Sequence, residues 1–316
     1  MNTQNTWAMV LAAGEGSRLA SLTTDRSGVA VPKQYCSLLG GATLLEDALH
    51  RAAEVVPVER IATIVAQSHQ RWWNGLRTPL GDRLVVQPAN RGTAHGVLLA
   101  LLHVLERDPA ARILFLPSDH YVRDEQTLAA AMRSALVMSD DDALVLLGIT
   151  PEEADPELGY IVQGSREPRG TYLVRRFIEK PEAWLARRLV DVGCMWNSFI
   201  FVANGAALLR LFQTHAPQAV ERMRAAMREG DAGLARLYAE LTDLDFSRHI
   251  LQRSEEQLRV WPVPRCGWDD LGTPRRLGKV LRRMPAPRTR AAGMHLFDTR
   301  AEVSLAHAHA RFQVAV

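Results

Sequence analysis

The sequence feature that most constrains this chain is an apolar segment that runs directly into a glycine-rich one. Residues 7–13 have the composition of a buried strand, and Gly-Glu-Gly-Ser-Arg-Leu follows at once. Gly14 and Gly16 can adopt positive φ angles and bring backbone N–H groups close to an anion. Arg18, and Lys33 in a later Pro-Lys-Gln segment, add positive charge that can neutralise phosphate. We therefore predict that this loop cradles phosphate groups.

Two other kinds of glycine-rich loop are excluded by their spacing. A P-loop requires Gly-x-x-x-x-Gly-Lys-Ser/Thr, which is absent. A dinucleotide-binding fingerprint requires a third small residue where Leu19 stands, and an acidic residue that closes the second strand. No acidic residue closes the apolar run at 61–66. The loop is therefore interpreted neither as a P-loop nor as the start of a dehydrogenase.

Composition places the chain among ordinary globular proteins. Of its 316 residues, 47% are hydrophobic and 23% charged, and no apolar run approaches the ~20 residues that span a bilayer. The first six residues are polar and uncharged, unlike a signal peptide, so we expect a cytoplasmic protein. The net charge of +3 is mild and the arginines are scattered along expected helices. We expect no nucleic-acid or membrane partner.

The three cysteines are Cys36, Cys194 and Cys266. They are far apart in sequence and lack the paired spacing of a zinc site or a disulfide framework. We therefore predict that they are reduced thiols.

Apolar runs alternate with helical patterns through the first half of the chain. The expected strands are 7–13, 60–66, 83–87, 112–117 and 143–149, and the expected helices are 43–55, 93–107 and 125–138. Such alternation predicts an α/β fold with a doubly wound, mostly parallel sheet. Ligands in these folds bind at the carboxyl ends of the strands, where the glycine loop and Asp119 both fall.

After residue 155 the expected strands become shorter. They cover 158–163, 171–178, 198–203 and 258–263, mixed with helices near 181–190, 204–213 and 217–228. A Pro/Arg-rich stretch at 285–288 indicates a linker. We therefore divide the chain into a main domain, 1–283, and a linker with a short tail, 284–316. His307 and His309 in this tail are interpreted as surface residues of a short strand rather than as a metal site.

Further motifs carry a resemblance to a known family. They are Pro-Ala-Asn-Arg-Gly-Thr-Ala (88–94), Leu-Pro-Ser-Asp-His (116–120), Leu-Gly-Tyr-Ile (158–161), Phe-Ile-Glu-Lys-Pro (177–181), Trp-Asn-Ser (196–198) and Trp-Asp-Asp-Leu-Gly-Thr (268–273). With the glycine loop and Pro-Lys-Gln, this series resembles the sugar-1-phosphate nucleotidyltransferases, and among them the mannose-1-phosphate guanylyltransferases. The resemblance extends over roughly residues 7–275. It implies a nucleotide-diphospho-sugar transferase fold, with sugar-binding strands added in the second half.

The resemblance implies a nucleotide site at the glycine loop. The implied nucleotide-binding residues are Ala12, Ala13, Gly14, Gly16, Arg91, Gly92 and Thr93, of which the last three cover the base and ribose. Arg18 is assigned to the leaving pyrophosphate and Lys33 to the α-phosphate. Thr93 is also placed to cap the helix that it opens. Members of the family often have Asn where this chain has Gly92 and Pro where it has His95, which leaves the choice of base open.

Two aspartates are candidates for magnesium ligands. Asp119 follows an apolar strand, so its side chain is expected at the carboxyl edge of the sheet. The resemblance makes Asp119 and Asp270 the Mg²⁺ ligands, and Mg²⁺ needs only one or two carboxylates besides phosphates and water. Asp270 could instead cap a helix that begins near Thr273, and Asp269 is the competing ligand.

The sugar phosphate is assigned to the second half of the chain. By resemblance, Glu179 accepts hydrogen bonds from sugar hydroxyls and Lys180 holds the sugar phosphate, with a solvated Glu-Lys pair as the alternative. Asn197 can donate to and accept from neighbouring hydroxyls. Gly159 is expected to leave room for the sugar ring. Phe199 stands where the family commonly has glycine, so its ring either reshapes the sugar pocket or packs inward.

The expected reaction converts a nucleoside triphosphate and a sugar 1-phosphate into a nucleotide sugar and pyrophosphate. The acceptor oxygen attacks the α-phosphorus in line, which needs no protein nucleophile. GTP with mannose 1-phosphate is the preferred pair, and UTP, dTTP or ATP with glucose 1-phosphate is the alternative. A non-catalytic nucleotide-sugar sensor is less favoured because Arg18, Lys33, Asp119 and Asp270 are all present. The expected partners are these small molecules, and a homodimer is left open.

Overall fold

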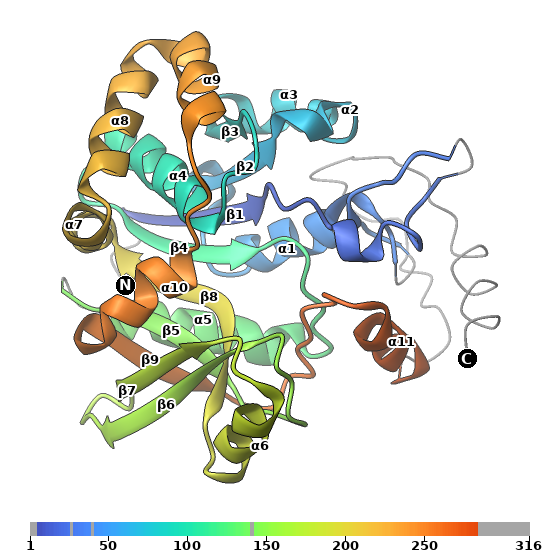
Figure 1. Cartoon of the computed structure of the whole chain (residues 1–316), viewed down its shortest axis with the longest axis vertical. Helices are drawn as coiled ribbons and strands as arrows, with labels where there is room; N and C mark the ends of the chain where they lie inside the picture. The colour runs from blue at the N-terminus through green and yellow to red at the C-terminus, as the bar shows by residue number, and fades with distance from the viewer. Residues whose placement is uncertain (1–4, 26–27, 39–40, 140–141, 284–316) are drawn as a thin grey trace.

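The computed structural model describes residues 5–25, 28–38, 41–139 and 142–283. One nine-stranded sheet with the order β3-β2-β1-β4-β8-β5-β9-β7-β6 crosses the molecule (Figure 1). Its strands are β1 (Thr6–Ala12), β2 (Ile61–Ala66), β3 (Leu84–Gln87), β4 (Arg112–Pro117), β5 (Leu144–Ile149), β6 (Gly159–Arg166), β7 (Tyr172–Glu179), β8 (Met195–Asn204) and β9 (Leu258–Val263). All nine overlap strands expected from the sequence.

The strand directions confirm the predicted α/β fold. β1 pairs in parallel with β2 and β4, β2 with β3, and β5 with β9. In the described sheet, β7 and β8 run opposite to the other seven strands, and β8 lies between β4 and β5. β8 begins three residues earlier than expected, so Trp196, Asn197 and Ser198 lie within the strand.

Helices cover both faces of the sheet, and each face has its own apolar core. Along β1, Ala8 and Val10 join one core, whereas Trp7 and Met9 join the other, as side-chain alternation in a strand requires. The first core is shared with α1 (Leu44–Ala53), α5 (Glu125–Met138), α6 (Ala183–Asp191) and α11 (Pro274–Arg283). The second is shared with α4 (Thr93–Arg107), α7 (Gly205–His215), α8 (Pro217–Arg228), α9 (Gly230–Glu240) and the short α10 (Phe246–His249).

The sequence missed several elements between the expected ones. Two short helices, α2 (Gln70–Trp73) and α3 (Arg77–Leu80), join β2 to β3. α9 follows α8 directly, and Figure 1 shows the two helices side by side at the opposite end of the molecule from β6 and β7. After α9, residues 241–245 lead back toward the centre and into α10. That return brings a part of the chain not expected there to the start of α4.

The structure describes the cysteines and the helices, but not the C-terminal tail. Cys36, Cys194 and Cys266 are buried and free, and burial raises the pKa of each thiol. In the described part of the chain, no helix is long and apolar enough to cross a membrane. The linker and tail at 284–316, with His307 and His309, lie outside the described residues.

Candidate active site

Two clefts meet at the carboxyl ends of β1 and β4. The glycine-loop cleft, of about 330 Å³, is lined by Ala13, Gly14, Gln34, Asn90, Asp119 and others. The Glu179 cleft, of about 170 Å³, is lined by Gly159, Glu179, Lys180, Asn197, Asp270 and others. Four residues line both clefts, namely Arg18, Thr93, His120 and Phe199. A larger open depression of about 710 Å³ over α7 contains none of the predicted site residues.

Gln34, which was not among the predicted site residues, fixes the backbone at the start of the glycine loop. Gln34 donates from Nε2 to the carbonyl oxygens of Ala12 (3.0 Å) and Gly14 (2.9 Å). Gly16 has a φ of 64°, and a Cβ there would lie 3.0 Å from the backbone nitrogen of Lys33. The expectation of a positive φ at Gly14 is wrong, because only Gly16 of the pair adopts one. Gly14 has open space beside it instead.

The side chain of Lys33 is buried beside this loop. It begins a 3₁₀ turn that Pro32 precedes, and its side chain is 9% exposed. Its Nζ lies 2.9 Å from a carboxylate oxygen of Asp119 and donates to the carbonyl of Asp270 (3.2 Å). Lys33 therefore connects the segments that carry the two candidate metal ligands.

A β-bridge brings these two aspartates together although about 150 residues separate them in sequence. Tyr121 and Asp269 exchange backbone hydrogen bonds of 2.8 and 2.9 Å. Beside the bridge, Trp268 donates from its indole nitrogen to Nδ1 of His120 (3.2 Å), so the proton of the neutral imidazole lies on Nε2. Burial lowers the pKa of His120 to about 4, although Asp119 and Asp270 oppose the shift. The histidine at the junction of the clefts is therefore uncharged near neutral pH.

Asp270, rather than Asp269, lines the Glu179 cleft. Its Oδ1 accepts hydrogen bonds from Arg276 and from the backbone of Gly272. Burial by itself acts to raise the pKa of the carboxyls of both Asp269 and Asp270. At Asp270, the charges of Arg276 and Lys33 and the hydrogen bond from Gly272 more than offset burial, so its pKa falls below the usual value, whereas that of Asp269 stays above it. Asp270 does not cap α11, because Thr273 does so by accepting from the backbone of Arg276.

Arg276 was not predicted from the sequence, yet it organises this region. Its side chain is 6% exposed and lies 2.7 Å from Oδ2 of Asp155, while its other terminal nitrogen contacts Asp270. Asp155 accepts a second bond from Nε at 3.0 Å. Arg276 thus ties α11 and the 150–157 segment to the carboxylate of Asp270. No sequence signal distinguishes it from the exposed neighbour Arg275.

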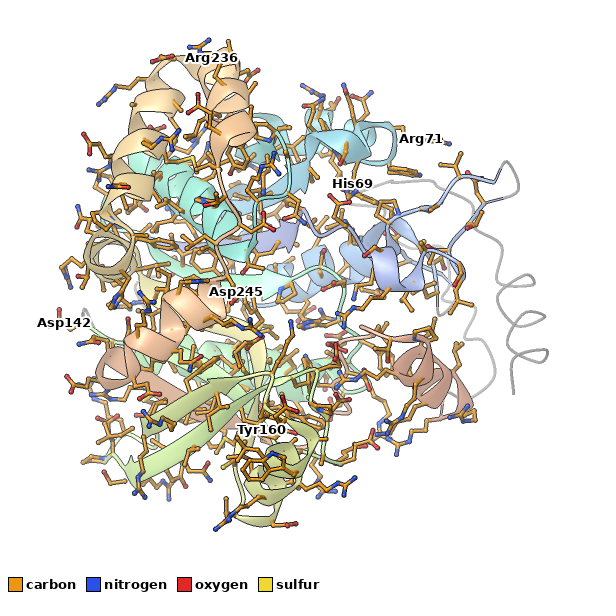
Figure 2. The ribbon with its side chains drawn as sticks, viewed as in Figure 1. His69, Arg71, Asp142, Tyr160, Arg236 and Asp245 are labelled. Atoms are coloured by element: carbon orange, nitrogen blue, oxygen red, sulfur yellow. The ribbon has the colours of Figure 1, made fainter. Side chains whose placement is uncertain are left out.

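The residues assigned to the sugar come together from several segments. Glu179 ends β7, and its carboxylate lies 3.7 Å from Nζ of Lys180. A Cβ at Gly159 would lie 2.6 Å from Oε2 of Glu179, so this glycine makes room for the carboxylate rather than directly for the sugar. Burial raises the pKa of Glu179, against the opposing charge of Lys180. Asp245, labelled in Figure 2, also lines this cleft, near the centre of the molecule.

Residues 241–245 determine the shape of the loop at 90–93. Gly92 has a φ of 81°, and a Cβ there would lie 2.4 Å from the carbonyl oxygen of Leu244. The predicted capping by Thr93 is wrong, because Gly92 is the N-cap of α4 and Thr93 Oγ1 accepts from the backbone of Phe246 (2.8 Å). Arg91 donates to the carbonyl of Tyr238 on α9 and is not among the residues that line the clefts.

Arg18 lies between the clefts. It forms an ion pair of 2.8 Å with Glu157, and both side chains are about half exposed. Such a pair contributes little to stability, so the guanidinium can exchange Glu157 for an anionic ligand at small cost. The prediction that Arg18 contacts phosphate is compatible with this position.

The carboxylates of Asp119 and Asp270 are the candidate ligands of a divalent cation. The side chains of Asp119 and Asp270 are 27% and 19% exposed, and oxygen ligands are those that Mg²⁺ prefers. A Cβ at Gly272 would crowd Asp270, since it would lie 3.0 Å from Oδ2 of Asp270 and 3.2 Å from Nη2 of Arg18. The described residues contain no group of three or more His, Cys, Asp or Glu side chains able to hold a metal. Phosphates and water would therefore complete the coordination.

Comparisons with known proteins identify the family of the chain. A family model described as nucleotidyl transferase matches residues 7–285. The mannose-1-phosphate guanylyltransferase of Sinorhizobium fredii is 28% identical over 84% of this chain and 52% of its own length. The enzyme of that name from Escherichia coli K12 is also 28% identical, over 84% of this chain and 58% of its own. The chain thus spans a little over half the length of these relatives.

The match to one solved structure extends over a larger share of that protein's chain. That structure is described as mannose-1-phosphate geranyltransferase from Thermus thermophilus, is 32% identical and superposes with a TM-score of 0.74. The match covers 85% of this chain and 76% of that one. Because the family model spans most of the sequence, the chain belongs to the nucleotidyl transferase family.

Proposed function

We propose that this chain transfers a nucleotidyl group from GTP to mannose 1-phosphate, giving GDP-mannose and pyrophosphate, with Mg²⁺ as cofactor. The observation that carries the proposal is the junction of the two clefts. A phosphate-binding loop lines one cleft, a carboxylate and a lysine line the other, and Arg18 and His120 line both. Two anionic substrates bound in the two clefts would meet beside Asp119 and Asp270.

The reaction is a displacement at phosphorus. An oxygen of the sugar phosphate bonds to the α-phosphorus while the bond from that phosphorus to the pyrophosphate oxygen breaks. The attacking oxygen is already ionised, so no general base is required. Mg²⁺ held by Asp119 and Asp270 would neutralise charge on the phosphates. Catalysis then consists mainly of alignment and charge neutralisation.

Each basic residue of the site is assigned to one phosphate group of the substrates. Arg18 binds the leaving pyrophosphate at the mouth shared by the clefts, and Lys33 supplies positive charge for the α-phosphate. Lys180 positions the acceptor phosphate. Glu179 and Asn197 hydrogen-bond to the sugar hydroxyls, which fixes the acceptor in orientation.

The choice of GTP and mannose 1-phosphate is supported by the printed names of the curated relatives. The test is pyrophosphate release by the full chain over a matrix of GTP, UTP, dTTP and ATP with mannose 1-phosphate and glucose 1-phosphate, with and without Mg²⁺. We expect kcat/KM for GTP with mannose 1-phosphate to exceed the other pairs by at least about tenfold, since one or two base contacts supply that much. A preference for UTP or dTTP with glucose 1-phosphate would refute the substrate assignment. Undiminished turnover without any divalent ion would refute the role of Mg²⁺.

A further inference from the structure

Phe199 has a backbone conformation that phenylalanine rarely adopts. Its φ is 57°, in the left-handed region that favours glycine. The other non-glycine residues with positive φ in the described chain are Lys180 and Leu271, which adjoin Glu179 and Asp270. Non-glycine residues persist in this region only where the surrounding structure holds them, and they cluster at functional sites. All three are at or beside the Glu179 cleft.

A bulge in β8 holds Phe199 in this conformation. The register of β8 against β5 shifts between the Gly148–Asn197 and Leu146–Phe201 pairs. Ser198 donates from its hydroxyl to the carbonyl of Leu147 (2.7 Å), and Asn197 Oδ1 accepts from the backbone of Phe199 (3.1 Å). A bulge of this kind redirects a side chain, here that of Phe199.

The ring of Phe199 is fixed as well as its backbone. It makes edge contacts with Phe201, at 6.2 Å between ring centroids, and with Phe246, at 5.9 Å. Both partners are fully buried in the core. The ring is therefore supported from behind, and it cannot turn away from a ligand without disturbing the core.

The supported ring stands where the two clefts join. Of the four residues that line both clefts, Phe199 alone is a large apolar side chain. The Glu179 cleft, at about 170 Å³, has about half the volume of the glycine-loop cleft. A rigid wall in the smaller cleft limits the size of the sugar that can lie beside Glu179 and Asn197.

We propose that Phe199 determines acceptor specificity by size, admitting hexose 1-phosphates that carry only hydroxyl groups and excluding those with an acetamido group. This inference rests on the proposed function. The ring of Phe199 would exclude the larger sugar by steric overlap, not by withholding a hydrogen bond. Removing the ring should therefore allow the acetamido sugar phosphate to bind.

The test compares glucose 1-phosphate with N-acetylglucosamine 1-phosphate, which differ only in the acetamido group that replaces one hydroxyl. Pyrophosphate release is measured with wild-type chain, Phe199→Gly, Phe199→Ala and, as a control that keeps a large apolar side chain, Phe199→Leu. We expect the wild type to prefer the hydroxyl sugar by about 100-fold in kcat/KM, and the Gly and Ala variants to reduce that ratio at least about tenfold. Phe199→Leu should retain most of the discrimination.

The outcomes separate this inference from the proposed function. An active wild type that accepts both sugars equally, or that uses mannose 1-phosphate and neither of them, overturns the inference without any variant. Folded Gly and Ala variants that keep the wild-type ratio overturn it as well. A chain that releases no pyrophosphate with any pair of nucleotide and sugar phosphate refutes the proposed function, and the inference falls with it. Circular dichroism of each variant establishes that it is folded before its ratio is used.

Discussion

Replacing Arg276 by methionine should destabilise the protein far more than removing its neighbour Arg275. Arg276 is 6% exposed and contacts Asp155 and Asp270, whose side chains are 10% and 19% exposed. Methionine leaves both carboxylates without this guanidinium, and removal of one partner from a buried ion pair costs about 3–5 kcal/mol. Arg275 is 72% exposed beside Glu153, and such a surface pair is worth about 0–1 kcal/mol.

Urea unfolding followed by circular dichroism measures both costs. We expect the free energy of unfolding to fall by about 3–5 kcal/mol in Arg276→Met and by less than about 1 kcal/mol in Arg275→Ala. Adding Asp155→Asn to Arg276→Met should recover part of the loss, because one unpaired charge is removed with its partner. Equal losses in the two arginine variants would refute the argument that burial makes Arg276 the charge partner of Asp270. A double variant no more stable than Arg276→Met would refute the pairing with Asp155.

Three more predictions follow from the site. Asp119→Asn should abolish turnover and also lower stability by about 1–3 kcal/mol, since buried Lys33 loses its carboxylate; an active or equally stable variant would contradict this. Glu179→Gln should raise the free energy of unfolding at pH 8, because burial raises the pKa of Glu179 and its ionised form is disfavoured in the folded state. The gain should vanish below the usual glutamate pKa of about 4.3. A gain that grows toward acid pH would refute the direction of this pKa shift. In thermal unfolding, Gly92→Ala should lower the melting temperature more than the control Gly193→Ala. Both glycines have φ near 80°, but only at Gly92 would a Cβ meet a backbone atom, the carbonyl oxygen of Leu244 at 2.4 Å. Equal losses would refute the contact with Leu244.

The sheet was predictable because its signals are local. Each strand is a short apolar run bounded by loops, and the alternation with helices indicates parallel pairing. The insertion of β8 between β4 and β5 was not predictable, because strand order depends on contacts between residues more than about 80 positions apart in sequence. The same limit explains α9, whose glycines at 230 and 233 weaken a helical pattern that tertiary packing nevertheless stabilises.

The site was predictable where its residues end strands or belong to a motif. Asp119 and Glu179 follow this rule, since one lies just beyond β4 and the other ends β7. Arg276 does not, because its neighbour Arg275 is chemically identical and only the fold determines which of the two is buried. Gln34 was visible in the Pro-Lys-Gln segment, but its role depends on the two carbonyls that it reaches in the glycine loop.

The two departures from the family pattern at the start of α4 have one structural explanation. The backbone of Leu244 donates to the carbonyl of Arg91 and accepts from Ala94, so it passes directly over Gly92. A residue with a Cβ, such as the asparagine common in the family, would collide with it. His95 makes its own contact with the same segment, through Nε2 and the carbonyl of Thr242 (3.1 Å). Both substitutions therefore accommodate the connection between α9 and α10, and neither is by itself an argument against guanine as the base.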